Sequence, residues 1–181
     1  MNRPTLILTL TLLLIAGSMA LQSCSDDSCY DNGSSLPLAV CYVGDVKQSI
    51  SGLTVKGIGA PGDSLLADSS TISEIYLPLR ASVSSTDYEL CRWVQRGDNV
   101  TPFHDTIHVE YEAVPFFHSA ECGAMFNFNI KRVTWTDNAI DSVVMLKTTV
   151  TNSVDPAMRI HFTSFDQRRH LSHIALSGRQ C

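Results

Sequence analysis

The stretch TIHVEYE, Thr106–Glu112, decides the fold class because its apolar and polar residues alternate without a break. In an extended chain, Ile107, Val109 and Tyr111 would point to one side and the intervening polar side chains to the other. A period of two residues is typical of an antiparallel strand with one face on the core and the other in water. We therefore predict a half-buried strand here.

The flanking sequence continues this pattern. Phe126, Phe128 and Ile130 alternate with polar residues, and the apolar parity then shifts to Val133 and Trp135. A bulge that inserts one extra residue would produce such a shift. Further strands are predicted within residues 38–43, 53–59, 74–80, 88–94, 142–151 and 158–162.

Short strands joined by Gly, Asp, Asn and Ser, without convincing helical periodicity, favour an all-β fold. We expect seven or eight strands in a single immunoglobulin-like antiparallel β-sandwich, residues 36–163, with a small barrel as the alternative. The polar tail, residues 164–181, is expected to be loose or a short helix.

The N-terminus has the layout of a secretory signal peptide, residues 1–23, with Arg3, an apolar run and then small residues. The apolar run, Leu6–Ala16, is about 11 residues long, whereas a membrane-spanning helix needs roughly 20. At its end, the sequence LQSC resembles a bacterial lipobox. Cys24 is therefore predicted to carry acyl chains that anchor the protein in a membrane. The alternative is an ordinary cleavable signal, with Cys24 in a disulfide.

The residues after Cys24 resemble a lipoprotein sorting signal. In bacterial lipoprotein sorting, an aspartate directly after the acylated cysteine favours retention in the inner membrane. Ser25 at this position therefore indicates the outer membrane. Together with Asp26 and Asp27 it resembles the acidic export signal of lipoproteins displayed on the cell surface by Bacteroidota. Residues 24–35 would then form a lipidated tether. The alternative is a solvated acidic linker on the periplasmic face.

The charge of the chain argues against nucleic-acid binding, and its cysteine content indicates disulfides. The formal net charge is −5, and no basic cluster points to nucleic acid. Besides the acylated cysteine, an odd number of cysteines remains in an exported chain, where disulfides persist. A Cys29–Cys122 bridge would pin the tether to the domain. Cys41 and Cys91 either pair or are small buried hydrophobes, and Cys181 is the candidate unpaired thiol.

Motifs of catalysis and cofactor binding have little support. Residues 57–62, GIGAPG, have the spelling of a dinucleotide fingerprint but lack the helix that must follow, so we predict a turn. His104 and His108 would lie about 13 Å apart on a strand, too far to share a metal. Glu110 and Glu112 share the outward face of one strand, and no G-x-S-x-G elbow is present. We expect no enzyme, no metal and no cofactor.

Aromatic residues are the best binding candidates. Most are expected in the core, but Phe116 and Phe117 follow a proline within a predicted loop, Val114–Glu121. One of them would be exposed and would form a contact for a protein partner. Trp93 and Trp135 could instead form a sugar-binding platform.

Several segments occur together behind the lipobox cysteine: GIGAPGDSLL (57–66), IYLPLR (75–80), HDTIHVEYEAVPFFHSAECGAMFNFNI (104–130) and IHF (160–162). Over residues 24–163 they resemble an uncharacterised family of Bacteroidota outer-membrane lipoproteins, a domain of unknown function. The resemblance implies a small β domain on a lipid anchor, supports the Cys29–Cys122 bridge and supplies no catalytic residues. Such lipoproteins tend to be encoded beside an outer-membrane β-barrel protein.

We therefore expect a lipid-anchored, non-catalytic outer-membrane lipoprotein that is a binding or accessory subunit for an outer-membrane β-barrel protein, in the assembly or export of outer-membrane proteins. The barrel would be met edge to edge or through the Val114–Glu121 loop. The alternative is a surface lipoprotein that binds glycans or captures nutrients.

Overall fold

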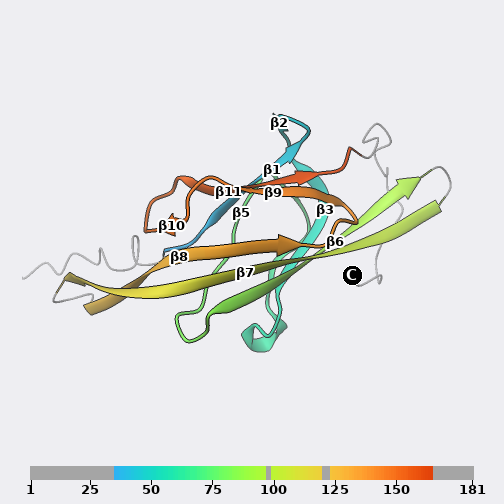
Figure 1. Cartoon of the computed structure of the whole chain (residues 1–181). Coiled ribbons are helices and arrows are strands. Elements are labelled where there is room, and N and C mark those ends of the chain that lie inside the picture. Colours follow the sequence, from blue (N-terminus) through green and yellow to red (C-terminus); the bar gives the residue numbers. More distant parts are fainter. Residues whose placement is uncertain (1–34, 97–98, 120–122, 165–181) are drawn as a thin grey trace, which may run out of the picture. The chain divides into compact units, whose positions relative to one another are not determined.

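The computed structural model describes residues 35–96, 99–119 and 123–164 (Figure 1). In these ranges the chain forms strands β1 to β11 and one 3-10 turn, η1 (Pro61–Asp63), with no α-helix. The chain divides after Asn32, and every described residue belongs to the second unit, Gly33–Cys181.

One antiparallel sheet of six strands contains the stretch TIHVEYE, which lies in the middle of β7. The strand order is β10-β8-β7-β6-β3-β4. The strands are β10 (Thr149–Val150), β8 (Gly123–Trp135), β7 (Asn99–Ser119), β6 (Ser85–Arg96), β3 (Ile50–Gly57) and β4 (Leu65–Ile72). β7 is 21 residues long, three times the length that TIHVEYE alone indicates.

A second sheet has the order β2-β1-β11-β9, and β5 also pairs with β1. Its strands are β2 (Val46–Lys47), β1 (Leu38–Val43), β11 (Pro156–Phe162), β9 (Ile140–Met145) and β5 (Glu74–Tyr76). β1 and β11 run parallel, so the first and last strands of the described domain lie side by side. This pair departs from the purely antiparallel arrangement that the sequence predicts.

The hydrophobic core lies between the two sheets, which Figure 1 shows as two layers. Ile107 and Val109 of β7 are fully enclosed, and the facing sheet contributes Cys41 and Met158. Burying an aliphatic side chain of this size stabilises a fold by about 1.5–3 kcal/mol. The predicted all-β sandwich is confirmed, and the side of TIHVEYE that faces the core is the predicted one.

The parity shift in β8 is a bulge, as predicted. Glu110 of β7 pairs with Arg132, whereas the next residue, Tyr111, pairs with Ile130, so Lys131 is the extra residue. The bulge allows Ile130 and Val133 both to pack on the core.

Two parts of the strand pattern differ from the prediction. The single strand expected over residues 142–151 is divided into β9 and β10, which belong to different sheets. The chain turns after Met145, where the amides of Leu146 and Lys147 both donate to the carbonyl of Ala157. β4 was not expected, because its sequence LLADSSTI lacks alternation and most of its side chains are exposed at the sheet edge.

Candidate functional site

Strands β7 and β8 continue beyond the rest of the sheet as a two-stranded ribbon. The ladder between β6 and β7 ends at the pair Ser85–Glu110, and β10 pairs only with Phe128 and Asn129 of β8. Beyond these points β7 and β8 pair with each other, and no other described strand joins them. We define the ribbon as residues 114–119 with residues 123–127. Figure 1 shows it running out past the ends of the neighbouring strands.

One face of the ribbon continues the core-facing side of the sheet. Pro115 pairs with Phe126, and Phe117 pairs with Ala124, so these four side chains share one face. The same face begins in the core with Phe128, which is 5% exposed, and then leaves it: Phe126 is 39% exposed and Phe117 is 72% exposed. We call these four residues the apolar face.

The opposite face of the ribbon is more protected. Val114, Phe116, Met125 and Asn127 are half-buried. At its base the hydroxyl of Ser35, a buried residue, donates to Oδ1 of Asn127 over 3.2 Å. The first described residue of the chain therefore lies beside the ribbon.

The ribbon contains almost no charge. Between residues 114 and 127 the sequence has no lysine, arginine or aspartate, and Glu121 is its one acid. At the base, Glu112 forms an ion pair with Lys131 of 2.7 Å, which lowers the pKa of Glu112. A projecting element without charge and with exposed phenylalanine is typical of a surface that another molecule covers.

The predicted partner contacts, Phe116 and Phe117, lie on this ribbon. Residues 114–119 are not part of a loop as predicted, because β7 continues through Ser119 and pairs with β8 from Ile107 to Ser119. Successive side chains of a strand point to opposite faces, so Phe117 joins the apolar face while Phe116 lies half-buried on the other.

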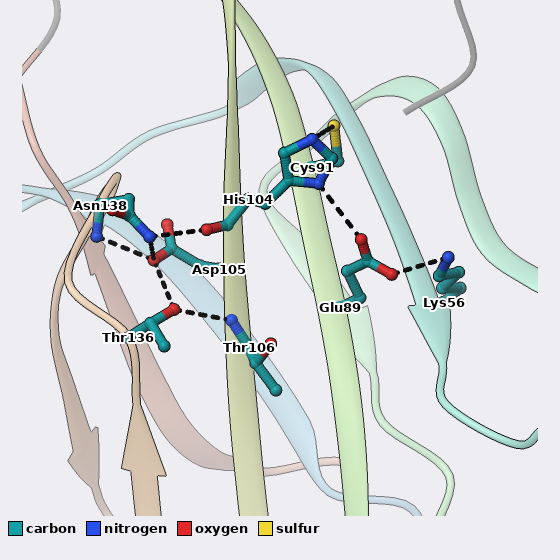
Figure 2. A network of polar contacts seen from close by, with 8 residues as sticks. All are labelled: Lys56, Glu89, Cys91, His104, Asp105, Thr106, Thr136 and Asn138. Carbon is teal, nitrogen blue, oxygen red and sulfur yellow. Dashed lines mark hydrogen bonds and ion pairs between the residues drawn. The ribbon is translucent and has the colours of Figure 1, made fainter.

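A polar ladder crosses the outward face of the same sheet, farther from the ribbon (Figure 2). Lys56 Nζ lies 2.7 Å from one oxygen of Glu89, and Nδ1 of His104 lies 3.2 Å from the other. The hydrogen bond from Lys56 is the main cause of a lowered pKa at Glu89, to which His104 adds. Nε2 of His104 is 3.9 Å from the sulfur of Cys91, which is disulfide-bonded and so is no nucleophile.

The two histidines of β7 contact different carboxylates. His104 contacts Glu89, whereas His108 contacts Asp87 and Glu110. The described residues contain no group of three or more metal-binding side chains.

Asp105 is a buried carboxyl group that the sequence pattern did not predict. Its carboxylate accepts hydrogen bonds from Thr136 Oγ1 (2.8 Å), from the amides of Asn138 (2.9 Å), Ala139 (2.7 Å) and Ile140 (3.1 Å), and from Asn138 Nδ2 (3.4 Å). Figure 2 shows the side chains of this network. The bonds fasten the turn that leads from β8 to β9, and so join the two sheets. Asp105 is structural, and its position at the start of D-T-I-H-V is the signal that could have found it.

Arg92 is a second buried charged group that was not predicted, although it interrupts the apolar alternation of Tyr88, Leu90 and Val94. It lies on the core-facing side of β6 between Leu90 and Val94, and all three are buried. Burial lowers the pKa of Arg92, and its Nε has no hydrogen-bond partner among the described residues.

The two tryptophans do not form a common platform. Trp93 pairs with Pro102 and Trp135 pairs with Ile107, and these partners lie on opposite sides of β7. Trp135 packs against the core.

The glycine-rich segment 57–62 is a turn between two strands, as predicted. β3 ends at Gly57, η1 covers Pro61–Asp63 and β4 follows. Gly59 and Gly62 have φ angles of 71° and 68°, which favour glycine, and no helix follows to receive a phosphate.

Of the two alternatives left open for Cys41 and Cys91, a bond between them is excluded, because Cys41 is a free, buried thiol while Cys91 is disulfide-bonded. Burial raises the pKa of Cys41 to about 12. The unpaired thiol predicted at Cys181 lies outside the described residues, among which Cys41 is a free thiol. The other predicted positions lie outside the described residues: Cys24, Ser25, Asp26, Asp27, Cys29, Cys122, His118 at the side-chain level, and the tail from residue 165.

Comparison of the sequence with known proteins identifies the family of this chain. Residues 52–162, more than half of the chain, match a family of unknown function (DUF6452). The chain belongs to this family. The matched region runs from β3 to the end of β11 and includes the whole ribbon. No curated protein and no solved structure is significantly similar to the chain. The described ranges contain no helix long and apolar enough to cross a membrane.

Proposed function

We propose that the protein is a lipid-anchored, non-catalytic outer-membrane lipoprotein that binds an outer-membrane β-barrel protein as an accessory subunit. The observation that carries this proposal is the exposed apolar face at the end of an uncharged ribbon. The lipobox at Cys24 and the following Ser25, Asp26 and Asp27 support the anchor and a position on the cell surface. A role in the assembly or export of outer-membrane proteins fits such a subunit.

The apolar face suits a protein contact in composition and shape. Aromatic side chains that fill a partner's pocket dominate binding energy, and the contacts around them contribute little energy but exclude water. Phe117 supplies such an anchor and Phe126 lies diagonally beside it on the same face. Phe116, on the opposite face, would contact the partner if the ribbon is enclosed on both sides.

The backbone edges of the ribbon favour a partner made of strands. No described strand pairs with the outer edge of either ribbon strand, and an open edge accepts a further strand. Pro115 has no amide hydrogen, and prolines within a sheet place this side on an open edge. The edge of β8, residues 123–127, is therefore the better template for an edge-to-edge contact.

The anchor is tested by fractionation. Cys24→Ala removes the acylated thiol, so we expect the protein to move from the envelope to the soluble fraction. Cys41→Ala is the matched control, because it removes a free thiol that lies in the core and should leave the protein in the envelope. Envelope association of the Cys24→Ala variant would refute the anchor.

The partner is tested by photo-cross-linking in intact cells. A photoreactive amino acid in place of Phe117 should give an adduct with an integral outer-membrane β-barrel protein. The same amino acid in place of Val46, which is 66% exposed on the other sheet, should not give that adduct. Equal yields from both positions, or adducts with lipid alone, would contradict the proposed partner.

A further inference from the structure

The hydrogen bonds at the base of the ribbon show which of its backbone groups are open. In an antiparallel pair of strands, facing residues alternate between pairs that bond to each other and pairs that do not. The amide of Ile130 donates to the carbonyl of Thr148 over 2.7 Å. On the facing strand, the amide of Tyr111 donates to the carbonyl of Ser84 over 2.8 Å. Tyr111 and Ile130 face each other with both amides pointing away, so this is a pair without mutual hydrogen bonds.

The alternation continues into the ribbon and places its open backbone groups on the residues of the apolar face. The register of β7 and β8 shows no shift between Tyr111 and Phe117, so every second pair in this range lacks mutual hydrogen bonds. These pairs include Pro115 with Phe126 and Phe117 with Ala124. The amides and carbonyls of Ala124 and Phe126 therefore point to the outer edge of β8.

Pro115 provides an independent check of this alternation. A proline has no amide hydrogen, so within a ladder it fits only where its nitrogen points away from the neighbouring strand. The pair of Pro115 with Phe126 meets this condition, because neither residue donates to the other. The outer edge of β7 consequently lacks a donor at Pro115, whereas the outer edge of β8 keeps both of its donors.

The outer edge of β8 is also better suited to a further strand than β4, at the other end of the sheet. β4 shifts its register against β3 at three points, and Ser69 has a φ angle of 43°. Such irregularity hinders the pairing of an edge with another chain. β10 pairs only with Phe128 and Asn129 of β8, so an added strand could continue the line of β10 beside residues 123–127.

An added strand would extend the apolar face. Residues that face each other across two strands place their side chains on the same side of the sheet. The residues that pair with Ala124 and Phe126 would therefore lie beside the exposed ring of Phe126. Apolar side chains at these two alternate positions would remove the most apolar surface from water. Residues 114–127 contain no lysine, arginine or aspartate, so the ribbon favours an uncharged segment.

The closed wall of a β-barrel cannot supply this strand, because each of its strands is already paired on both sides. The strand must be one that the ladder of the barrel leaves unpaired, such as an extended terminal segment or a strand before the barrel has closed. Strands of outer-membrane barrels alternate between apolar and polar residues. This is the pattern that the edge at Ala124 and Phe126 would accept.

We infer that the outer edge of β8, at Ala124 and Phe126, pairs with an unpaired, extended segment of the β-barrel partner that has apolar residues at alternate positions. The inference rests on the proposed function, which supplies the partner. In this kind of pairing, main-chain hydrogen bonds give affinity and the alternate side chains give specificity.

Two substitutions at one position separate the backbone contact from the side chain. Phe126→Ala and Phe126→Pro both remove the ring, but only proline also removes the outward amide hydrogen. With a photoreactive amino acid in place of Phe117 in intact cells, we expect Phe126→Pro to give about tenfold fewer barrel adducts than Phe126→Ala, because an acceptor of the segment loses its donor. Equal yields from the two variants would overturn the inference and leave the proposed function in place. No barrel adduct without either substitution would overturn the proposed function.

Hydrogen exchange of single amides tests the assignment of the edge in the purified, acylated protein. The amides of Met125 and Asn127 join β7 and should exchange slowly. Those of Ala124 and Phe126 point away from β7 and should exchange about tenfold faster or more. Similar protection of all four amides, or the reverse order, would overturn the assignment. Slow exchange at Met125 in the Phe126→Pro variant shows that the ribbon still forms.

The position of the cross-link on the partner identifies what the edge binds. A photoreactive amino acid in place of Ala124 would lie beside the added strand. Mass spectrometry should place its adduct in a segment of the barrel protein that alternates between apolar and polar residues and lies outside the closed ladder. Adducts with the lipid-facing wall of a closed barrel, with a second copy of this chain or within this chain alone would each overturn the inference.

Discussion

The central and distal parts of β7 have the same pattern but different surroundings. In the central part, Ile107 and Val109 point into the core and are fully enclosed by the second sheet. In the distal part, Pro115 and Phe117 follow on the same side of the same strand, yet both are exposed. Tyr111 marks the boundary, with its ring packed edge-on against Phe128 at a centroid distance of 5.4 Å.

An apolar strand face can either stabilise the fold or remain exposed for binding, and the two parts of β7 differ in this respect. The central residues stabilise the fold because the second sheet removes them from water. The distal residues gain no such stabilisation within the described chain, since Phe117 remains 72% exposed. Their apolar character fits the binding surface that we propose.

The largest expected loss of stability is at Asp105, whose hydrogen bonds to the turn between β8 and β9 join the two sheets. Asp105→Ala removes the acceptor of three backbone amides, and each buried donor left without a partner costs about 1–3 kcal/mol. We expect the free energy of unfolding to fall by about 4 kcal/mol or more, measured by urea denaturation. Asp105→Asn keeps one acceptor oxygen and should lose less. If Asp105→Ala lowered the free energy of unfolding by less than about 1 kcal/mol, the hydrogen bonds of Asp105 would not be needed to join the two sheets.

The next effect compares the two parts of β7 directly. Ile107→Ala opens a cavity in the core and should cost about 2–5 kcal/mol. Phe117→Ala removes a larger but exposed side chain and should change stability by no more than about 0.5 kcal/mol. Similar losses for the two variants in urea denaturation would mean that Phe117 stabilises the fold as Ile107 does, which would contradict a ribbon that is free to bind.

A smaller loss of stability is expected at Tyr111, which lies between the central and distal parts of β7. The hydroxyl of Tyr111 lies 2.8 Å from Oγ1 of Thr86 and 3.0 Å from both the amide and the carbonyl of Arg80. Tyr111→Phe keeps the ring against Phe128 but removes these bonds, so we expect a loss of about 1–2 kcal/mol in thermal or urea unfolding. An unchanged stability would show that the segment before β6 is not held by this residue.

The smallest effect concerns Cys41, on the enclosed side of the comparison. Burial raises the pKa of its thiol from 9.0 to about 12, so the folded protein keeps it neutral. Its contribution to stability is complete below pH 9 and is lost as the pH rises from 9 toward 12. Iodoacetamide at pH 8 should therefore label this thiol only after unfolding, as measured by mass spectrometry. Rapid labelling of the folded protein would contradict its enclosure.

The sequence predicted the fold class and the orientation of most strands, because alternation records which side of a strand is apolar. It correctly placed the bulge near Arg132 and the enclosed face of Thr106–Glu112. It did not predict the division between β9 and β10, or the edge strand β4, because neither carries a two-residue period. It also could not show that β1 and β11 pair in parallel, which depends on contacts between distant segments.

The candidate site was predicted only in part. A proline followed by two phenylalanines pointed to an exposed aromatic, and Phe117 is exposed. Alternation does not record where the facing sheet ends, so the sequence suggested a loop where β7 continues as a ribbon. Asp105 was missed because its partners are backbone amides more than thirty residues away.

The most direct test of the account is to ask whether the apolar face is covered where the protein works. Hydroxyl-radical footprinting with mass spectrometry can compare oxidation of Phe117 and Phe126 in isolated outer membranes and in the purified protein. We predict strong protection of both residues in membranes, with Val46 oxidised equally in the two samples. Equal oxidation of Phe117 and Phe126 in membranes and in solution would contradict the claim that the ribbon is a binding surface.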